Sequence, residues 1–469
     1  MVMTEMLRTF LQYVGVFFII YLAVYASFLF SSVLVGSVGL YRRRKMRRLK
    51  NELDEEYYIP ISILVPAYNE EVTVVDTVRS LLQLDYPLYE IVVVDDGSKD
   101  ETAERLIRHY QMQKINRPVR MQIPCKRMRE VYETKVGNTI LTLISKDNGG
   151  KADTLNMGIN ASRYPYFICM DADSVLQTDS LREIIKPILE NDKLVASGGL
   201  VRISNCATIR DGKLVRYKMP WNPVVGMQVM EYDRSFLASR IMFDKFGGNL
   251  IISGAFGLFQ KRAVVDVGGY DTLTMGEDME LVVKLHVFCR THNIPYGIQY
   301  TPDAVCWSQA PSGVADLAKQ RRRWHLGLFQ SMMKFRQMFL NPSCGLVGFV
   351  SYTYYLFYEL LSPLIEIFGV FTMVLAYTVN LVNVRFMFFF YLMYAVFGCL
   401  LTLTAFFARI YTQNITLSFL DVMKAVFMCI AEGIVLHFIL LFVRLGAFIG
   451  YRKRKKDWGR IRRKKINIE

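Results

Sequence analysis

The chain has 469 residues, of which 52% are apolar and 13% aromatic, and its mean hydropathy of +0.22 is high for a soluble protein. Its formal charge of +15 is concentrated in basic tracts beside apolar stretches, at residues 42–50 and 452–465, so anionic lipids and phosphate-bearing ligands are the expected partners. The sequence contains no nucleic-acid-binding motif, and we expect no nucleic-acid partner.

The first predicted element is a membrane helix. Residues 10–40 form an apolar run that is too long for the core of a signal peptide and is followed at once by YRRRKMRRLK. Because basic residues gather on the cytoplasmic side of membrane helices, we expect the N-terminus outside and the next domain in the cytosol. Together with the later apolar stretches, this predicts a multi-pass protein of the cell membrane.

From residue 61 onward, short β-branched runs alternate with amphipathic helical stretches. The predicted strands are 61–65, 91–94 and 166–170, and the predicted helices include 72–84 and 100–111. This βαβ alternation predicts an α/β fold with a mostly parallel, Rossmann-like sheet and ligands at the carboxyl ends of the strands.

Residues 114–142 are basic and poorly periodic and form an apparent insertion between a strand and a glycine-rich motif. Such a segment could shape a partner or regulatory surface. We interpret this segment as a solvated loop.

Three apolar stretches near the C-terminus, at 345–380, 384–410 and 422–450, are each long enough to cross a bilayer. Three crossings would leave the strongly basic tail outside, against the usual charge bias. Either 345–380 makes two short crossings around Ser362-Pro363, or one of the last segments is re-entrant or lies in the membrane interface. The predicted organisation is a membrane helix with its basic tract (1–50), a cytosolic α/β domain (51–310), interfacial helices (311–345), transmembrane helices (346–450) and a basic tail (451–469).

Four short motifs carry the chemistry of the predicted cytosolic domain. They are VVVDDGS with Asp95 and Asp96, ICMDADS with Asp171 and Asp173, TMGEDME with Glu277 and Asp278, and QRRRW from Gln320 to Trp324. A carboxylate pair at a strand end is a natural site for a hard cation, and a later carboxylate suits a general base. An Arg-Trp pair can hold a phosphate and stack on a sugar ring.

These motifs, in this order and with VPAYNEE at 65–71 ahead of them, closely resemble the processive membrane-integrated family-2 glycosyltransferases. That group includes cellulose, hyaluronan, chitin and poly-N-acetylglucosamine synthases, and the resemblance extends from about residue 61 to the C-terminus. It implies a GT-A fold joined to interfacial and transmembrane helices. It also implies an inverting, UDP-sugar-dependent hexosyltransferase that polymerises a β-linked polysaccharide and translocates it across the plasma membrane. The implied partners are a UDP-sugar donor, a nascent glycan acceptor and the lipid bilayer.

The resemblance assigns roles to individual residues. Asp278 matches the catalytic base, and Asp173 with Asp171 matches the ligands of Mg²⁺ or Mn²⁺. The UDP-binding candidates are Asp96, Asp95, Lys151, Arg323, Ala67 and Glu70, and the acceptor-binding candidates are Gln320, Trp324, Phe256 and Glu277. An Asp-x-Asp turn can also be a capping device, and an acid at a helix start also stabilises that helix. We interpret Arg321 and Arg322 as the basic side of an interfacial helix.

The basic tail contains Asp457-Trp458-Gly459-Arg460, which resembles the gating loop of hyaluronan and chitin synthases. Trp458 and Arg460 are therefore candidate gating residues, although the family's threonine is absent here. An interfacial anchor is the alternative role of Trp458.

Three functions are compatible with these patterns. The first is a processive polysaccharide synthase, with glucan from UDP-glucose slightly favoured on family prevalence over a polymer of N-acetylglucosamine. The second is a non-processive lipid glycosyltransferase, and the third is a non-catalytic nucleotide-sugar-binding membrane protein. The sequence leaves open whether the chain works alone or as a homo-oligomer.

Overall fold

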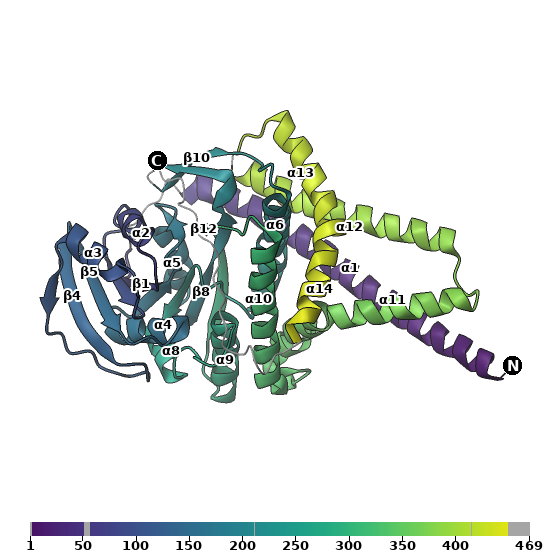
Figure 1. Cartoon of the computed structure of the whole chain (residues 1–469), viewed down its shortest axis with the longest axis horizontal. Helices are drawn as coiled ribbons and strands as arrows, with labels where there is room; N and C mark the ends of the chain where they lie inside the picture. The colour runs from purple at the N-terminus through teal and green to yellow at the C-terminus, as the bar shows by residue number, and fades with distance from the viewer. Residues whose placement is uncertain (1, 51–56, 211, 414, 449–469) are drawn as a thin grey trace.

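The structure is a computed structural model that describes residues 2–50, 57–210, 212–413 and 415–448. An α/β body lies at one end, and several apolar helices extend from it in the opposite direction (Figure 1). Helix α1 (Val2–Lys50) is continuous, and its N-terminus lies at the far end from the sheet. The predicted membrane helix and its basic tract are therefore one helix.

The body is built on a ten-stranded sheet in the order β3-β4-β5-β2-β1-β6-β11-β8-β12-β7. Its strands are β1 (Ile61–Ala67), β2 (Tyr89–Asp95), β3 (Gln113–Ile115), β4 (Met128–Val136), β5 (Thr139–Lys146), β6 (Tyr166–Cys169), β7 (Ser174–Leu176), β8 (Leu194–Ile203), β11 (Gly257–Gln260) and β12 (Gly297–Ser308). Strands β5, β2, β1 and β6 pair in parallel. The predicted α/β class and the three predicted strands are confirmed.

The parallel strands form because nearly every residue in them can be buried. All seven residues of β2 are buried, and its Ile and Val side chains suit a strand that is covered on both faces. The covering helices are α2 (Val74–Leu81), α3 (Thr102–Tyr110), α4 (Lys151–Ala161) and α5 (Ser180–Glu190). In α4, Gly158 packs on Leu64 of β1 so closely that an added Cβ would lie 3.3 Å from the leucine side chain. Close packing of this kind fixes α4 against the sheet.

The interpretation of residues 114–142 as a solvated loop is wrong. The segment contains the end of β3, all of β4 and the start of β5, which pair antiparallel in succession and extend the sheet at one edge. Gly137 permits the tight turn between β4 and β5 because its φ of +61° suits glycine. The sequence pattern is weak because Val131 is the one buried side chain of β4, which lies between β5 and the short outermost strand β3.

The second half of the body adds helices that connect the sheet to the apolar region. These elements are α6 (Pro223–Arg234), α7 (Arg240–Asp244), α8 (Lys261–Asp266), α9 (Glu277–Thr291) and α10 (Val314–Lys334), with a small sheet of β9 (Ala207–Arg210) and β10 (Lys213–Tyr217). Short 3-10 turns lie at Ser204–Cys206, Arg336–Met338 and Pro342–Cys344, and a π-helical turn joins α6 to α7 at Ser235–Ser239. Helices α6 and α10 stand between the sheet and the apolar helices (Figure 1).

The remaining elements are apolar helices. They comprise two π-helical turns (Val347–Tyr352 and Tyr355–Leu360), α11 (Ser362–Thr378), α12 (Val384–Thr412), α13 (Phe419–Ala431), a π-helical turn (Glu432–Leu436) and α14 (His437–Phe448). Three helices are long and apolar enough to cross a membrane, at Glu5–Met46, Val384–Thr412 and Phe419–Phe448 within the described residues. A fourth candidate, residues 347–378, is bent by 54° between Leu360 and Ser362. The bend falls beside Pro363, the position that the sequence singled out.

Candidate active site

The motif residues gather where the parallel strands end. Asp95 is the last residue of β2, Ala67 is the last residue of β1, and Asp171 follows β6 by two positions. The Ala67 carbonyl accepts a hydrogen bond from the Asp96 amide at 2.9 Å, which joins the first two strand ends. Lys151 begins α4, directly after the glycines that follow β5.

Asp96 is enclosed by a network that the sequence did not reveal. The Nζ atom of Lys146 lies 2.5 Å from Asp96 Oδ1 and 2.7 Å from Asp153 Oδ1, and the Lys146 side chain is completely buried. The amides of Gly149 and Gly150 donate to the two Asp96 oxygens at 2.9 and 2.8 Å. Asp96 therefore holds the glycine loop in place in addition to its predicted contact with UDP. A lysine at a strand end gives no sequence signal for such a role, because lysine is ordinarily exposed.

We expect Lys146→Met to destabilise the protein strongly. The variant would leave the carboxylates of Asp96 and Asp153 buried without their cation, and breaking one partner of a buried pair costs about 3–5 kcal/mol. Thermal unfolding in detergent, followed together with UDP affinity, measures this loss. Lys114→Met removes an exposed pair with Glu130 and is the matched control, which should leave the unfolding temperature nearly unchanged. Equal stability of the two variants would contradict the proposed network.

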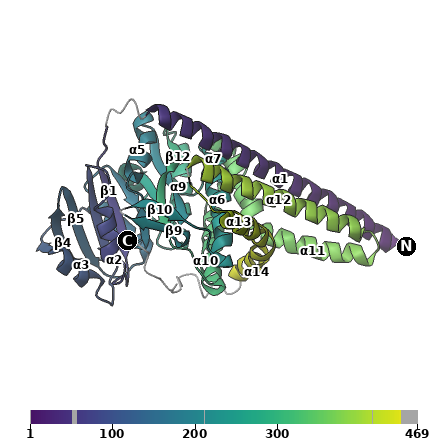
Figure 2. The same ribbon diagram turned by 90° about the horizontal axis from the view of Figure 1, so that it is seen from above.

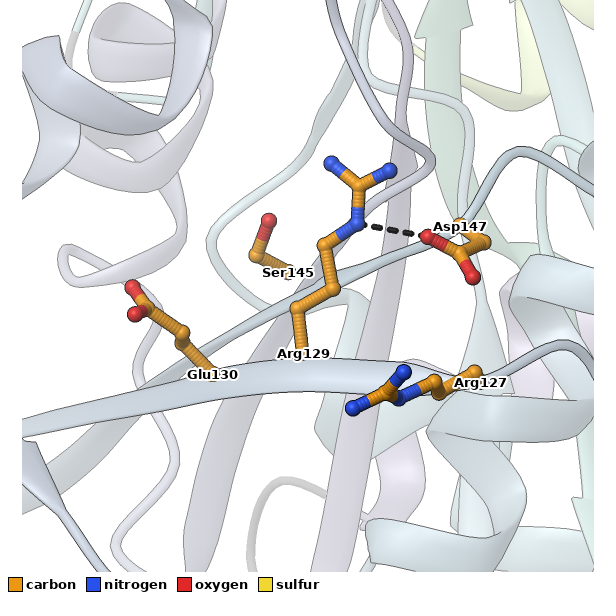
Figure 3. A pocket seen from close by; sticks show the side chains of 5 residues that line it. All are labelled: Arg127, Arg129, Glu130, Ser145 and Asp147. Carbon is orange, nitrogen blue, oxygen red and sulfur yellow. Dashed lines mark hydrogen bonds and ion pairs between the residues drawn. The ribbon is translucent and has the colours of Figure 1, made fainter.

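A polar pocket lies beside Asp95 (Figure 3). It is lined by Arg127, Arg129, Glu130, Ser145 and Asp147. Ser145 Oγ donates to Asp95 at 3.3 Å, and Arg129 Nε donates to Asp147 at 2.6 Å. Burial raises the pKa of the Asp95 carboxyl, although hydrogen bonds from Ser98 and Ser145 oppose the shift. Strand β4 thus contributes Arg129 and Glu130 to a pocket that shares Ser145 with the predicted nucleotide-binding acid Asp95.

Lys151 connects two of the acidic motifs. Its Nζ atom lies 2.5 Å from Asp171 Oδ1 and 3.5 Å from Glu277 Oε1. Burial lowers the pKa of Lys151, but the carboxylates of Asp171 and Glu277 outweigh burial and hold that pKa above its usual value. The side chain is therefore a fixed ammonium ion between the Asp-x-Asp motif and the start of α9.

Asp278 lies in the first turn of α9, against the loop that contains Gly254. The Gly254 amide donates to Asp278 Oδ2 at 3.2 Å, and the Met279 amide donates to Oδ1 at 2.8 Å. An added Cβ at Gly254 would lie 3.2 Å from Lys151 Nζ, so glycine allows this loop to approach both charged groups. The first turn of α9 is the positive end of the helix dipole, which is a favourable position for an acidic residue.

Glu277 precedes Asp278 and is buried. Burial raises the pKa of its carboxyl, whereas the charges of Lys151 and Arg323 lower it. Because the charge of Arg323 acts on the Glu277 carboxyl, the QRRRW motif lies close enough to share the electrostatic environment of Lys151 and Asp278. All four motifs therefore meet in one region of the molecule.

In α10, the tryptophan of QRRRW is held by an arginine of the same motif. The Arg321 guanidinium lies 4.4 Å from the centre of the Trp324 ring and donates to both Glu231 oxygens, at 2.7 and 2.6 Å. Trp324 is 41% exposed, so the free part of its ring can contact a ligand. The interpretation of Arg321 as part of a basic interfacial surface is wrong, because Arg321 is buried and pairs with α6. Gln320 Oε1 is buried and has no hydrogen-bond partner among the described residues.

We expect Glu231→Gln to weaken acceptor binding more than UDP binding. The change would leave a buried Arg321 cation without its bidentate partner at a cost of about 3–5 kcal/mol, and Trp324 would lose its fixed orientation. Separate titrations with UDP and with a glycan oligosaccharide give the two affinities. Glu231→Asp should restore part of the acceptor affinity. Asp316→Asn, which breaks an exposed pair with Lys319 on α10, should leave both affinities unchanged. An equal loss of both affinities in Glu231→Gln would contradict the idea that Glu231 positions Trp324 through Arg321.

Two other predicted residues, Phe256 and Glu70, are buried side chains. Phe256 is fully buried, with its ring against Gly199, so the structure puts this side chain in the core and not on an acceptor surface. Glu70 is buried at the start of α2 and accepts a hydrogen bond from Thr73 Oγ1 at 2.8 Å. Trp458 and Arg460 lie outside the described residues.

The Asp-x-Asp residues fit a hard divalent cation. Asp171 and Asp173 are both partly exposed at the sheet edge, and the contact of Lys151 with Asp171 shows that positive charge is stabilised there. Within the described part of the chain, no three or more His, Cys, Asp or Glu side chains are grouped to hold a metal. Mg²⁺ is usually held by one or two carboxylates and completes its coordination with phosphate and water, and Asp171 and Asp173 supply two carboxylates.

The fold and site define an α/β protein of the GT-A type, with acidic motifs at its strand ends and apolar helices attached. Residues 62–123 match the family described as glycosyl transferase family 2, and residues 166–445 match glycosyl transferase family group 2. This chain belongs to the family-2 glycosyltransferases.

The comparisons with individual proteins agree with this assignment. The chain is 32% identical over 317 residues to a poly-beta-1,6-N-acetyl-D-glucosamine synthase of Staphylococcus epidermidis, and 31% identical to one of Staphylococcus aureus strain COL. Each alignment covers 67% of this chain and 66% of the relative, so the match spans about two thirds of these relatives. A mannosyltransferase from Pyrobaculum calidifontis, solved in complex with GDP-Man and Mn²⁺, has a TM-score of 0.50 at 18% identity, covering 87% of this chain and 97% of that one. That likeness confirms the fold.

Proposed function

We propose that this chain is a processive, inverting glycosyltransferase of the plasma membrane. In this proposal it lengthens a β-linked polysaccharide from a UDP-sugar on the cytosolic side and moves the product across the membrane through its own helices. UDP-N-acetylglucosamine is the favoured donor, because the relatives named above are poly-beta-1,6-N-acetyl-D-glucosamine synthases. UDP-glucose is the second donor to test, because the sequence resemblance slightly favoured glucan on its prevalence in the family.

The observation that carries the proposal is the position of Lys151. Its ammonium group contacts Asp171 of the Asp-x-Asp motif and Glu277 beside the candidate base, Asp278. A cation between these acids is suited to a diphosphate leaving group, which develops negative charge as its bond to the sugar breaks. No purely structural role requires a lysine, three acids and a glycine loop to meet at the ends of parallel strands.

In the proposed reaction, the Asp278 carboxylate accepts the proton of the acceptor hydroxyl. The acceptor oxygen then attacks the anomeric carbon, the bond from that carbon to the UDP oxygen breaks, and the configuration inverts. Lys151 and Arg323 donate to the diphosphate, and Trp324 stacks on the acceptor sugar. Asp171 and Asp173 would hold Mg²⁺ or Mn²⁺, which supplies positive charge to the leaving diphosphate when bound.

Purified protein offered each UDP-sugar with Mg²⁺ or Mn²⁺ tests the proposal. We expect a polymer from UDP-N-acetylglucosamine that resists cellulase and is degraded by a hydrolase specific for β-linked N-acetylglucosamine. Products of one or two sugars attached to lipid would support a non-processive lipid glycosyltransferase instead. Binding of UDP-sugars without hydrolysis or transfer would leave a non-catalytic binding protein.

A further inference from the structure

We propose that a contact between two glycines, Gly276 and Gly327, positions the acceptor-binding face of α10 against the start of α9, so that the donor sugar passes to the acceptor and not to water. This inference rests on the proposed function and adds positioning residues to the same site. Gly276 directly precedes Glu277 at the start of α9, and Gly327 lies one turn after Trp324 on α10. The two glycines therefore join the helix that carries Asp278 to the helix that carries Trp324.

The backbones of the two elements touch at this point. A Cβ atom added to Gly327 would lie 2.6 Å from the Gly276 Cα atom, and one added to Gly276 would lie 2.8 Å from the Gly327 Cα atom. Because non-bonded carbon atoms prefer a separation of about 3.5–4.0 Å, a larger residue at either position would push α10 away from α9. The atoms that it would meet belong to the backbone, which cannot rotate aside as the end of a side chain can.

Local conformation requires glycine at neither position. Gly276 has a φ of −127°, which other residues adopt freely, and Gly327 lies inside the α-helix Val314–Lys334. Glycine inside a helix is less favourable than alanine, because it loses more conformational freedom on folding. The close approach of the two backbones is therefore the physical reason for glycine at both positions.

Gln330, one turn after Gly327, holds the loop that ends at Gly276. Its Oε1 atom accepts hydrogen bonds from the Met275 amide at 2.8 Å and from Thr274 Oγ1 at 3.2 Å. Because an amide oxygen has two lone pairs, both hydrogen bonds can form at once. They fix the loop to the face of α10 that carries Gly327.

Lys334 extends this attachment by one more turn. Its Nζ atom lies 2.7 Å from Asp271 Oδ2 and 2.6 Å from Oε1 of the buried Glu280. Positions 327, 330 and 334 are spaced by three and four residues, so they share one face of α10. This face is joined at three successive levels to the start of α9 and the loop before it.

Helix α14 packs beside α10 and closes the contact between α9 and α10 (Figures 1 and 2). Met275 of the loop, Leu326 of α10 and Ala447 of α14 form a buried apolar cluster. Close-packed interiors resist small displacements, so three elements that meet in this way leave α10 little freedom to move relative to α9.

The contact bears on the reaction because the acceptor and the base belong to different helices. In transfer, the acceptor sugar lies on Trp324, and its hydroxyl oxygen bonds to the anomeric carbon as UDP leaves and Asp278 takes the proton. In hydrolysis, a water oxygen forms that bond, and UDP and the proton leave in the same way. A displacement of about 1 Å can lower the rate of an oriented reaction about 10²-fold. Because α10 does not hold the water, its displacement should slow transfer much more than hydrolysis.

Separate rates of transfer and hydrolysis, measured on the purified full-length protein with UDP-N-acetylglucosamine, test this inference. We expect Gly327→Ala to lower the kcat of transfer by roughly 10²-fold, to change hydrolysis by less than about three-fold, and to keep the KM for the UDP-sugar. Gly398→Ala is the matched control, because Gly398 lies inside α12 and an added Cβ there would meet nothing within 4 Å. This control should keep the wild-type ratio of transfer to hydrolysis.

Gln330 provides a second pair of variants, which decides the question if Gly327→Ala does not fold. Gln330→Met has a similar length but accepts neither hydrogen bond, so the ratio of transfer to hydrolysis should fall roughly ten-fold. Gln330→Glu keeps an accepting oxygen and should keep a ratio near that of the wild type.

Three outcomes would contradict the positioning role. An unchanged ratio in a folded Gly327→Ala variant, or in Gln330→Met where Gly327→Ala does not fold, would overturn this inference and leave the proposed function standing. Equal losses of transfer and hydrolysis would show that the contact only supports the fold, and would also overturn the inference. A wild-type protein that hydrolyses UDP-sugars without transferring the sugar would refute the proposed function, and this inference with it.

Discussion

Asp278→Asn should lower glycosyl transfer by roughly 10²–10⁴-fold, the usual contribution of a general base, while UDP affinity stays near its original value. The Gly254 and Met279 amides donate to different oxygens of the aspartate, so the single amide oxygen of asparagine can accept one of these two hydrogen bonds, and the change of shape is minimal. The asparagine cannot take the proton of the acceptor hydroxyl. Initial rates of polymer synthesis and calorimetric UDP binding, measured on the same preparation, separate these two effects.

Asp266→Asn is the matched control for this experiment. Asp266 is a partly exposed acid at the end of α8, paired with Arg262, which is 90% exposed. Its loss should change neither rate nor UDP affinity. Near-normal turnover by Asp278→Asn would show that Asp278 is not the general base. A loss of UDP binding equal to the loss of rate would indicate that Asp278 has a structural role.

The residues that the sequence predicted well are those whose motif fixes their local structure. Asp95 and Asp171 follow buried strands, and Asp278 opens a helix, so simple rules for parallel sheets place these side chains at one edge. Lys151 was predictable for the same reason, because it follows two glycines that open α4. The contact that joins Lys151 to both Asp171 and Glu277 depends on packing between distant elements, and no local pattern encodes it.

Other features could not be predicted from the sequence, for identifiable physical reasons. Lys146 satisfies two buried acids that are 57 residues apart in the chain, so its environment is set entirely by tertiary structure. Strand β4 has one buried side chain, and its charged residues hide the alternation that normally reveals a strand.

Asp173→Ala should abolish detectable synthesis and remove the dependence of UDP affinity on Mn²⁺. The diphosphate needs several kcal/mol of charge stabilisation from a divalent cation, and the Asp-x-Asp motif supplies the carboxylates that fit one. The family resemblance makes Asp173 the firmer metal ligand of the two acids, so we expect this variant to show the larger effect. Calorimetry with UDP, with and without Mn²⁺, measures the effect without requiring turnover. Asp192→Ala, an exposed acid before β8, should keep the wild-type dependence. Undiminished synthesis by the wild-type protein in EDTA would contradict the role of a metal, and would make Lys151 and Arg323 the positive charges on which the leaving diphosphate depends.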